Sequence, residues 1–150
     1  MIPIMNKNIL VIGTLALDSI KTPSLDSGVI LGGAATYISF AISKISNKFG
    51  IVSVVGDDFP LKYLNRIKST GADISGVEII KNKQSFFWSG RYHVDINKRT
   101  TLDTKLGVLE NFNPIIPKKF TDSNIVVLGN LHPSVQNKSI NQLLGKNQFL

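Results

Sequence analysis

Short, mostly apolar runs recur along this 150-residue chain, and they constrain its fold more than any other feature. The runs at 8–12, 51–55, 77–80 and 125–128 are each four or five residues long, and a glycine directly follows three of them. Such runs are typical of strands that a parallel sheet buries on both faces. Because segments with helical spacing alternate with them, the order predicts an α/β fold with a doubly wound, mostly parallel sheet.

Three helices are expected around these strands. They run from the Gly32-Gly33 pair to Asn47 or Gly50, from about Pro60 to Thr70, and from Ser134 to about Leu144. Asp57 and Asp58 precede the second helix and are expected to cap it, and Gly71 is expected to end it. A further apolar run at 29–31 predicts a short strand before the first helix.

Residues 85–106 interrupt this order with a different pattern. Apolar and polar residues alternate along 85–94 and again along 99–106, and a turn at 95–97 separates the two segments. The pattern predicts an antiparallel hairpin that stands off the main sheet, with one apolar and one polar face. The apolar face would carry Phe86, Trp88, Tyr92, Leu102 and Leu106. The polar face would carry Arg91, Arg99, Asp103 and Lys105.

Composition and motif spacing exclude several classes of site. The chain has no cysteine, which excludes a disulfide framework, a thiol nucleophile and thiolate metal sites. His93 and His132 have no partners at metal-ligand spacing, so no metal site is predicted. No G-x-G-x-x-G motif joins a strand to a helix, which argues against a nicotinamide dinucleotide. No apolar run approaches the roughly 18 residues of a membrane span, so a soluble, cytoplasmic protein without a membrane partner is expected.

The net charge of +7 lies mostly in the second half of the chain. Basic residues are scattered there, and only Lys98-Arg99 and Lys118-Lys119 are adjacent pairs, so no nucleic-acid partner is expected. A solvated basic surface is the favoured interpretation. The alternative is that the positive field attracts an anionic substrate or cofactor.

Candidate binding residues lie where strands of the sheet end. Asp18 follows the first strand, at the edge where open α/β sheets bind ligands, and its carboxylate could accept hydrogen bonds from two sugar hydroxyls. Gly32 and Gly33 open a helix, where backbone N–H groups can approach a ligand closely. Asn130 follows the last strand. The alternatives are a capping aspartate, a tight turn with positive φ, and a turn asparagine.

Several motifs together resemble the ribokinase-like, or PfkB, family of carbohydrate kinases. The matching segments are 11–18 (VIGTLALD), 31–37 (LGGAATY), 54–59 (VVGDDF) and 71–77 (GADISGV). The hairpin at 85–106 is similar to the family's β lid. Residues 88–93 and 101–104 are similar to a subgroup usually labelled only as sugar kinase.

The resemblance implies a fold and a binding site. The fold would be a mostly parallel sheet with an antiparallel β lid, built from about 15–31 and 85–106. A sugar or nucleoside would bind between sheet and lid, held by Asp18, the backbone at Gly32 and Gly33, Tyr37 and Asn130. Many members carry asparagine where this chain has Tyr37, which disfavours a simple assignment as ribokinase. The lid residues Phe86, Trp88 and Tyr92 would cover the substrate or form a homodimer.

The resemblance also implies what lies outside this chain. The family's Gly-Ala-Gly-Asp-type motif, which carries the catalytic aspartate, and its sites for ATP and Mg²⁺ are expected beyond residue 150. Residues 1–150 are therefore expected to be the N-terminal part of an ATP-dependent sugar kinase, with the C-terminal half missing, and to be inactive alone. The alternatives are a nucleoside kinase of the same family and a non-catalytic fragment that binds a sugar or a partner.

Overall fold

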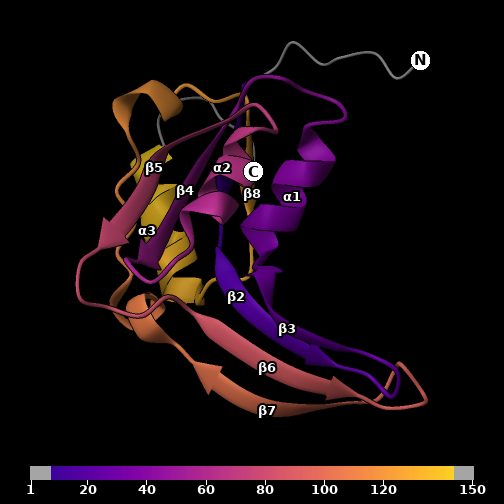
Figure 1. Ribbon diagram of the computed structural model, residues 1–150. Coiled ribbons are helices and arrows are strands. Elements are labelled where there is room, and N and C mark those ends of the chain that lie inside the picture. Colours follow the sequence, from indigo (N-terminus) through magenta and orange to yellow (C-terminus); the bar gives the residue numbers. More distant parts are fainter. Residues whose placement is uncertain (1–7, 144–150) are drawn as a thin grey trace.

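The main sheet is parallel throughout, as predicted. The computed structural model describes residues 8–143. Four strands form the sheet in the order β5-β4-β1-β8 (Figure 1). They are β1 (Ile9–Ile12), β4 (Phe49–Gly56), β5 (Ala72–Ile80) and β8 (Ile125–Leu128). All eight residues of β4 are buried, which is why its sequence shows no alternation.

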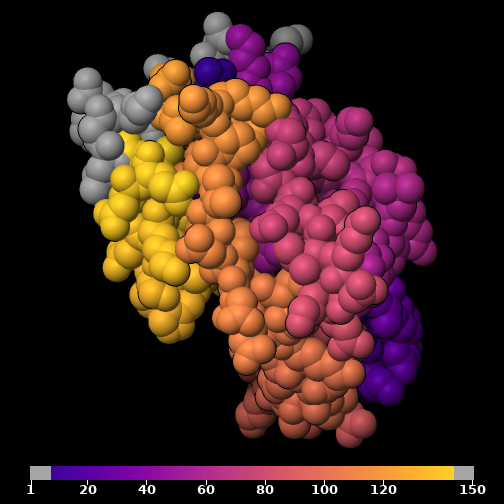
Figure 2. All heavy atoms as spheres, turned by 90° about the vertical axis from the view of Figure 1, so that its left-hand side faces the viewer, coloured from indigo at the N-terminus to yellow at the C-terminus, as the bar shows by residue number. Residues whose placement is uncertain are grey.

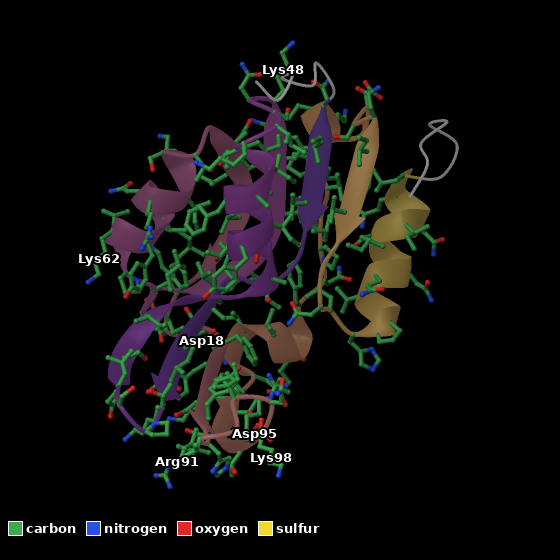
Figure 3. The ribbon with its side chains drawn as sticks, turned by 90° about the vertical axis from the view of Figure 1, so that its right-hand side faces the viewer. Asp18, Lys48, Lys62, Arg91, Asp95 and Lys98 are labelled. Carbon is green, nitrogen blue, oxygen red and sulfur yellow. The ribbon has the colours of Figure 1, made fainter. Side chains whose placement is uncertain are left out.

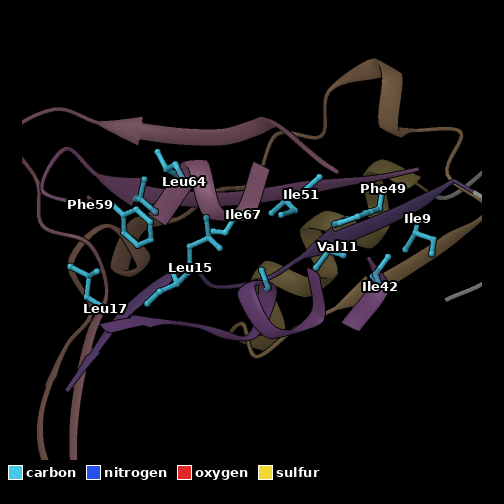
Figure 4. Close-up of a cluster of buried hydrophobic side chains, with 14 residues drawn as sticks. Ile9, Val11, Leu15, Leu17, Ile42, Phe49, Ile51, Phe59, Leu64 and Ile67 are labelled. Atoms are coloured by element: carbon cyan, nitrogen blue, oxygen red, sulfur yellow. The ribbon is translucent and has the colours of Figure 1, made fainter. Parts of the chain in front are cut away.

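Helices cover both faces of this sheet. The cluster in Figure 4 packs α1 (Ala34–Ile42) and α2 (Leu61–Lys68) against one face. The other face packs against α3 (Pro133–Leu143) and two 3-10 segments, η1 (Gly107–Asn111) and η2 (Lys118–Phe120). No helix within residues 8–143 has the length and apolar character needed to cross a membrane.

The helix ends differ from the predictions in two places. The first helix ends at Ile42 rather than at Asn47 or Gly50, because the backbone tightens there and the Ile45 N–H donates to the Ile42 carbonyl. The second begins one residue after Pro60 and ends before Gly71, whose φ of 91° confirms it as the stop. The predicted end of the third helix, Leu144, lies outside the described residues.

A second sheet lies at the carboxyl edge of the first. Its order is β3-β2-β6-β7, and the four strands project together as one layer (Figure 1). They are β2 (Ala16–Lys21), β3 (Asp26–Gly32), β6 (Phe87–Tyr92) and β7 (Arg99–Lys105). Each consecutive pair is an antiparallel hairpin, and β2 pairs in parallel with β6 to join the two hairpins. The alternating pattern predicted the second hairpin but no strand at β2, whereas the family resemblance placed part of the β lid at about 15–31, where β2 and β3 lie.

A β-bulge in β7 makes one part of the hairpin prediction wrong. Ser89 pairs with Asp103, but Gly90 pairs with Thr101, so Leu102 is an extra residue on β7. An extra residue reverses the alternation beyond it. Arg99 therefore lies on the face of Trp88 rather than opposite to it, and its guanidinium lies 5.5 Å from the centre of the Trp88 ring.

Candidate functional site

Thr14 joins three elements at the carboxyl edge of the main sheet. Its hydroxyl donates to Oδ1 of Asn130 (2.7 Å) and accepts from the N–H of Ala34 (3.1 Å), while its carbonyl accepts from the N–H of Ala35 (3.0 Å). It thus ties the end of β1 to the start of α1 and to the loop after β8. The sequence analysis missed Thr14, although its place directly after Gly13 at a strand end was a usable signal.

The glycine pair Gly32-Gly33 allows two close approaches. A Cβ on Gly33 would overlap the carbonyl oxygen of Thr14, and φ at Gly33 is 93°, which confirms the expected turn with positive φ. A Cβ on Gly32 would overlap the carboxylate of Asp18. Asp18 therefore lies directly against the backbone that leads into α1, where the two sheets meet (Figure 3).

The carboxylate of Asp18 is partly removed from water and has no partner in the described part of the chain. Burial raises its pKa above the ordinary value of 3.8. No hydrogen bond or ion pair to it occurs among residues 8–143. A carboxylate in this condition gains from any ligand that donates hydrogen bonds to it.

A hollow of about 460 Å³ opens between the two sheets and α3. Figure 2 shows this side of the molecule, with α3 in yellow and the segment around η1 in orange. The apolar lining consists of Phe86, Leu106, Leu109, Phe112, Leu131 and Val135. The polar lining consists of Thr14, Glu110, Asn130, His132 and Ser134. The volume lies within the range of small-molecule sites.

The structure brings together most, but not all, of the predicted site residues. Asn130 and Phe86 line the hollow, and Thr14 connects them to the Gly33 turn beside Asp18. Asp18 shares a face of the second sheet with Trp88, its pairing partner on β6.

The other predicted residues lie outside the hollow. Tyr37 is 56% exposed on α1 and does not line it. The ring of Trp88 lies over Gly90, and Tyr92 pairs with Arg99 farther from the main sheet.

Asp57 and Asp58 bind the segment between β5 and β6, where the chain enters the second sheet, instead of capping α2. The N-cap of α2 is Pro60, without a side-chain hydrogen bond. Oδ1 of Asp58 accepts from both the N–H (2.8 Å) and the hydroxyl (2.6 Å) of Ser85, and Oδ2 of Asp57 accepts from the N–H of Asn82 (2.9 Å). The cap prediction was wrong because the chain between β5 and β6 returns to this turn, a long-range contact with no local signal.

Metal-ligating side chains do not gather in the described chain. Among residues 8–143, no group of three or more histidine, aspartate or glutamate side chains could hold a metal ion. The described site offers the carboxylate of Asp18, the polar side chains of Thr14 and Asn130, and an apolar wall.

Comparison with solved structures decides the fold. The nucleoside kinase of Methanocaldococcus jannaschii superposes with a TM-score of 0.71 at 21% identity, over 94% of this chain and 50% of that one. Ribokinase from Cryptococcus neoformans, solved with ADP, superposes with a TM-score of 0.69 at 15% identity, over 95% and 46%. The chain has the ribokinase-like fold.

Comparison with curated sequences agrees with the ribokinase-like fold. A cytidine kinase from Thermococcus kodakarensis is 29% identical over 140 residues, which are 93% of this chain and 49% of the relative. No family model matches the chain. The chain thus spans about half the length of the curated relative and of the two solved structures, and the ribokinase-like fold that the motifs implied is confirmed.

Proposed function

We propose that this chain supplies the acceptor-binding part of an ATP-dependent kinase that phosphorylates a hydroxyl of a sugar or nucleoside. The observation that carries the proposal is Asp18, a half-buried carboxylate without a partner among residues 8–143, placed against Gly32 at the edge where α/β sheets bind ligands. The kinases with the same fold support the phosphotransferase class.

The acceptor side follows from the geometry at Asp18. Two neighbouring hydroxyls can each donate to one oxygen of its carboxylate, and such charge-assisted bonds fix the orientation of the sugar ring. Because Gly32 has no side chain, the carboxylate of Asp18 can lie directly against the backbone before α1. The apolar wall of the hollow would exclude water, which otherwise competes as the phosphoryl acceptor.

The donor side is proposed from the relatives. Among residues 8–143, no cluster of carboxylates could hold Mg²⁺. We propose that Mg²⁺ and ATP both bind to residues beyond 150, together with the catalytic aspartate. A kinase that uses ATP is expected in the cytoplasm, where ATP is abundant.

The hollow favours a nucleoside over a free sugar. Six of its lining side chains are apolar, and a sugar, which carries hydroxyls on every side, would leave them without a matching surface. A nucleobase has flat apolar faces that would cover them. The sugar of such a substrate would lie at Asp18 and its base in the hollow.

A second copy of the chain is proposed to cover the outer part of the second sheet. Leu102 is 45% exposed, and Trp88 and Tyr92 are only half-buried. A self-complementary apolar face favours a closed dimer. Trp88 on β6 pairs with Asp18 on β2, so dimer contacts at Trp88 would also help to order the binding site at Asp18.

Equilibrium binding tests the proposal on the 150-residue chain. Titration calorimetry with D-ribose and cytidine should detect binding, and Asp18→Asn should weaken it by about tenfold or more, since one charge-assisted bond is lost. Asp103→Asn is the matched control, because Asp103 lies on the opposite face of the same sheet. Equal binding by the wild type and Asp18→Asn would contradict the assigned role.

A further inference from the structure

Thr14 and Asn130 lie side by side because the ends of two strands approach closely. β1 and β8 pair in parallel, and each is followed by a glycine, Gly13 and Gly129. A Cβ on Gly129 would lie 3.1 Å from the Cα of Gly13, which is tighter than ordinary van der Waals contact. The N–H of Gly129 donates to the carbonyl of Ile12 (2.7 Å) and holds the loop after β8 against the end of β1. The next side chains, Thr14 and Asn130, therefore meet at a fixed place on the wall of the hollow.

The hydroxyl of Thr14 determines which end of the Asn130 amide it contacts. Thr14 is 2% exposed, so a hydroxyl proton without an acceptor would be destabilising there. The hydroxyl oxygen accepts from the N–H of Ala34 (3.1 Å), which can only donate, so the hydroxyl keeps its own proton to donate. Among residues 8–143, its acceptor is Oδ1 of Asn130, at 2.7 Å. A reversed amide would turn its N–H groups toward the Thr14 oxygen and leave the buried hydroxyl proton without an acceptor.

Asn130 therefore has its amide nitrogen left for a ligand. Its Oδ1 is occupied by Thr14, and within residues 8–143 no hydrogen bond is made by Nδ2. Asn130 lines the hollow, where its side chain offers a ligand two N–H donors. The carboxylate of Asp18, in contrast, offers only acceptors when it is ionised.

Thr14 also completes the start of α1, and this second role has to be separated from the first. Ala34 and Ala35 are the first residues of α1, and the N-cap, Gly33, has no side chain that could bond their N–H groups. The hydroxyl and carbonyl oxygens of Thr14 accept from them instead (3.1 and 3.0 Å). These two N–H groups, which a helix leaves without an internal partner, are thus already bonded. Removing the hydroxyl changes both the helix start and the Asn130 amide.

We propose that Thr14 is a positioning residue of the binding site, which makes Asn130 a hydrogen-bond donor to the substrate. The assignment rests on the proposed function, since it takes the substrate to be a sugar or nucleoside held at Asp18. The atom that Asn130 binds is an acceptor of that molecule: a ring oxygen, a hydroxyl oxygen or a carbonyl oxygen of a base. Asp18 then accepts from hydroxyls of the substrate, and Asn130 donates to one of its oxygens.

Asn130→Asp tests the direction of the amide. Aspartate keeps an oxygen for the Thr14 hydroxyl but has no N–H, so the melting temperature should stay within about 2 °C of the wild type. Cytidine should bind about tenfold or more weakly in calorimetry on the 150-residue chain, because an acceptor then faces the acceptor of the ligand. Unchanged or tighter binding would show that Asn130 presents its oxygen to the ligand, and would overturn the proposal.

Thr14→Val tests whether Thr14 acts through Asn130. Valine has the shape of threonine without the hydroxyl, and it should weaken cytidine binding about three- to tenfold, the range for one hydrogen bond. In an Asn130→Ala background the same change should weaken binding by less than about a further twofold, because no amide is left to orient. Thr14→Ser, which restores the hydroxyl, should bind within about twofold of the wild type. An equal effect of Thr14→Val in both backgrounds would show that Thr14 acts on α1 alone, and overturns the proposal.

Thr70→Val is the matched control. Thr70 lies between α2 and β5, at the opposite edge of the main sheet, and its hydroxyl donates to the Ile67 carbonyl (2.6 Å). Its cytidine affinity should equal that of the wild type, and thermal melts identify any variant that does not fold. If Thr14→Val does not fold, Asn130→Asp still decides the direction of the amide.

The binding data also separate this assignment from the proposed function. Binding that depends on Asp18 but is unchanged in Asn130→Ala overturns the assignment and leaves the proposed function standing. Absence of binding by both cytidine and D-ribose overturns both.

Discussion

Ser85 should be among the most sensitive polar positions of the chain. It stands where the loop after β5 turns into β6, and it is 1% exposed. Its hydroxyl donates to Oδ1 of Asp58 (2.6 Å) and accepts from the N–H of Gly56 (2.9 Å). Ser85→Ala removes both bonds at once and leaves the Gly56 N–H buried without an acceptor.

The magnitude follows from these two losses. A hydrogen bond to a carboxylate contributes about 1.5–3 kcal/mol, and an unpaired buried N–H costs about 1–3 kcal/mol. The free energy of unfolding should therefore fall by about 3–5 kcal/mol, a large part of the roughly 5–15 kcal/mol of a typical domain. With a urea dependence near 2 kcal/mol per molar, the midpoint of unfolding should fall by about 1.5–2.5 M.

Urea titration followed by circular dichroism measures this change. Trp88 is the only tryptophan and lies in β6, so its fluorescence reports on the second sheet in the same experiment. Ser69→Ala is the control: Ser69 is exposed, its hydroxyl bonds only the nearby Arg66 carbonyl (2.8 Å), and its effect should stay within about 0.5 kcal/mol. A midpoint for Ser85→Ala within about 0.5 M of the wild type would refute the reasoning.

Three further outcomes are expected. Burial raises the pKa of Asp18, so folding favours its protonated form; that stabilisation is present below pH 3.8 and is lost as pH rises through the raised pKa. Asp18→Asn should thus unfold at pH 7 no earlier than the wild type, and a clearly lower melting temperature would mark Asp18 as structural. Burial alone would raise the pKa of Asp73, but hydrogen bonds from Lys119 (2.6 Å) and Ser75 lower it to about 2. The stabilisation from ionised Asp73 is present above pH 3.8 and is lost as pH falls toward 2. Lys119→Met should therefore lower the free energy of unfolding by less than about 1 kcal/mol at pH 7, because the pair is half-exposed, and should not change it near pH 2. An equal decrease at both pH values would count against the pair. Trp88→Ala should weaken the proposed dimer in sedimentation velocity, and an unchanged oligomeric state would assign the aromatic face to the fold alone.

The main sheet was predictable because burial on both faces leaves a clear mark in the sequence. The runs at 8–12 and 51–55 are apolar because β1 and β4 are fully buried, and the run at 125–128 is apolar although β8 is only partly buried. β2 left no such mark. Ala16 and Leu17 are buried, but Asp18, Ser19 and Lys21 are polar and only half-buried, because the rest of β2 extends away from the apolar core.

The site was predictable only where a residue's role depends on its neighbours in sequence. Gly33 needed a positive φ at a helix start, and both signals were local. The role of Ser85 depends on its contact with Asp58, and the side of the sheet on which Arg99 lies depends on the bulge at Leu102. Neither could be predicted from the alternation of residues along the sequence. The hydroxyl of Thr14 finds Asn130 only after β8 has joined β1.

The parallel pair that joins the two hairpins of the second sheet has a consequence for the order of folding. Leu17 on β2 pairs with Phe87 on β6, a residue about 70 positions later in the chain. During synthesis, the hairpin of β2 and β3 must wait for that distant partner, and an isolated two-stranded hairpin is at best marginally stable in water. Closing so long a loop is slow, so the second sheet should form after β1, β4 and β5 have come together. The surface around Asp18, where we propose that a substrate binds, would then be the last part of this chain to become ordered.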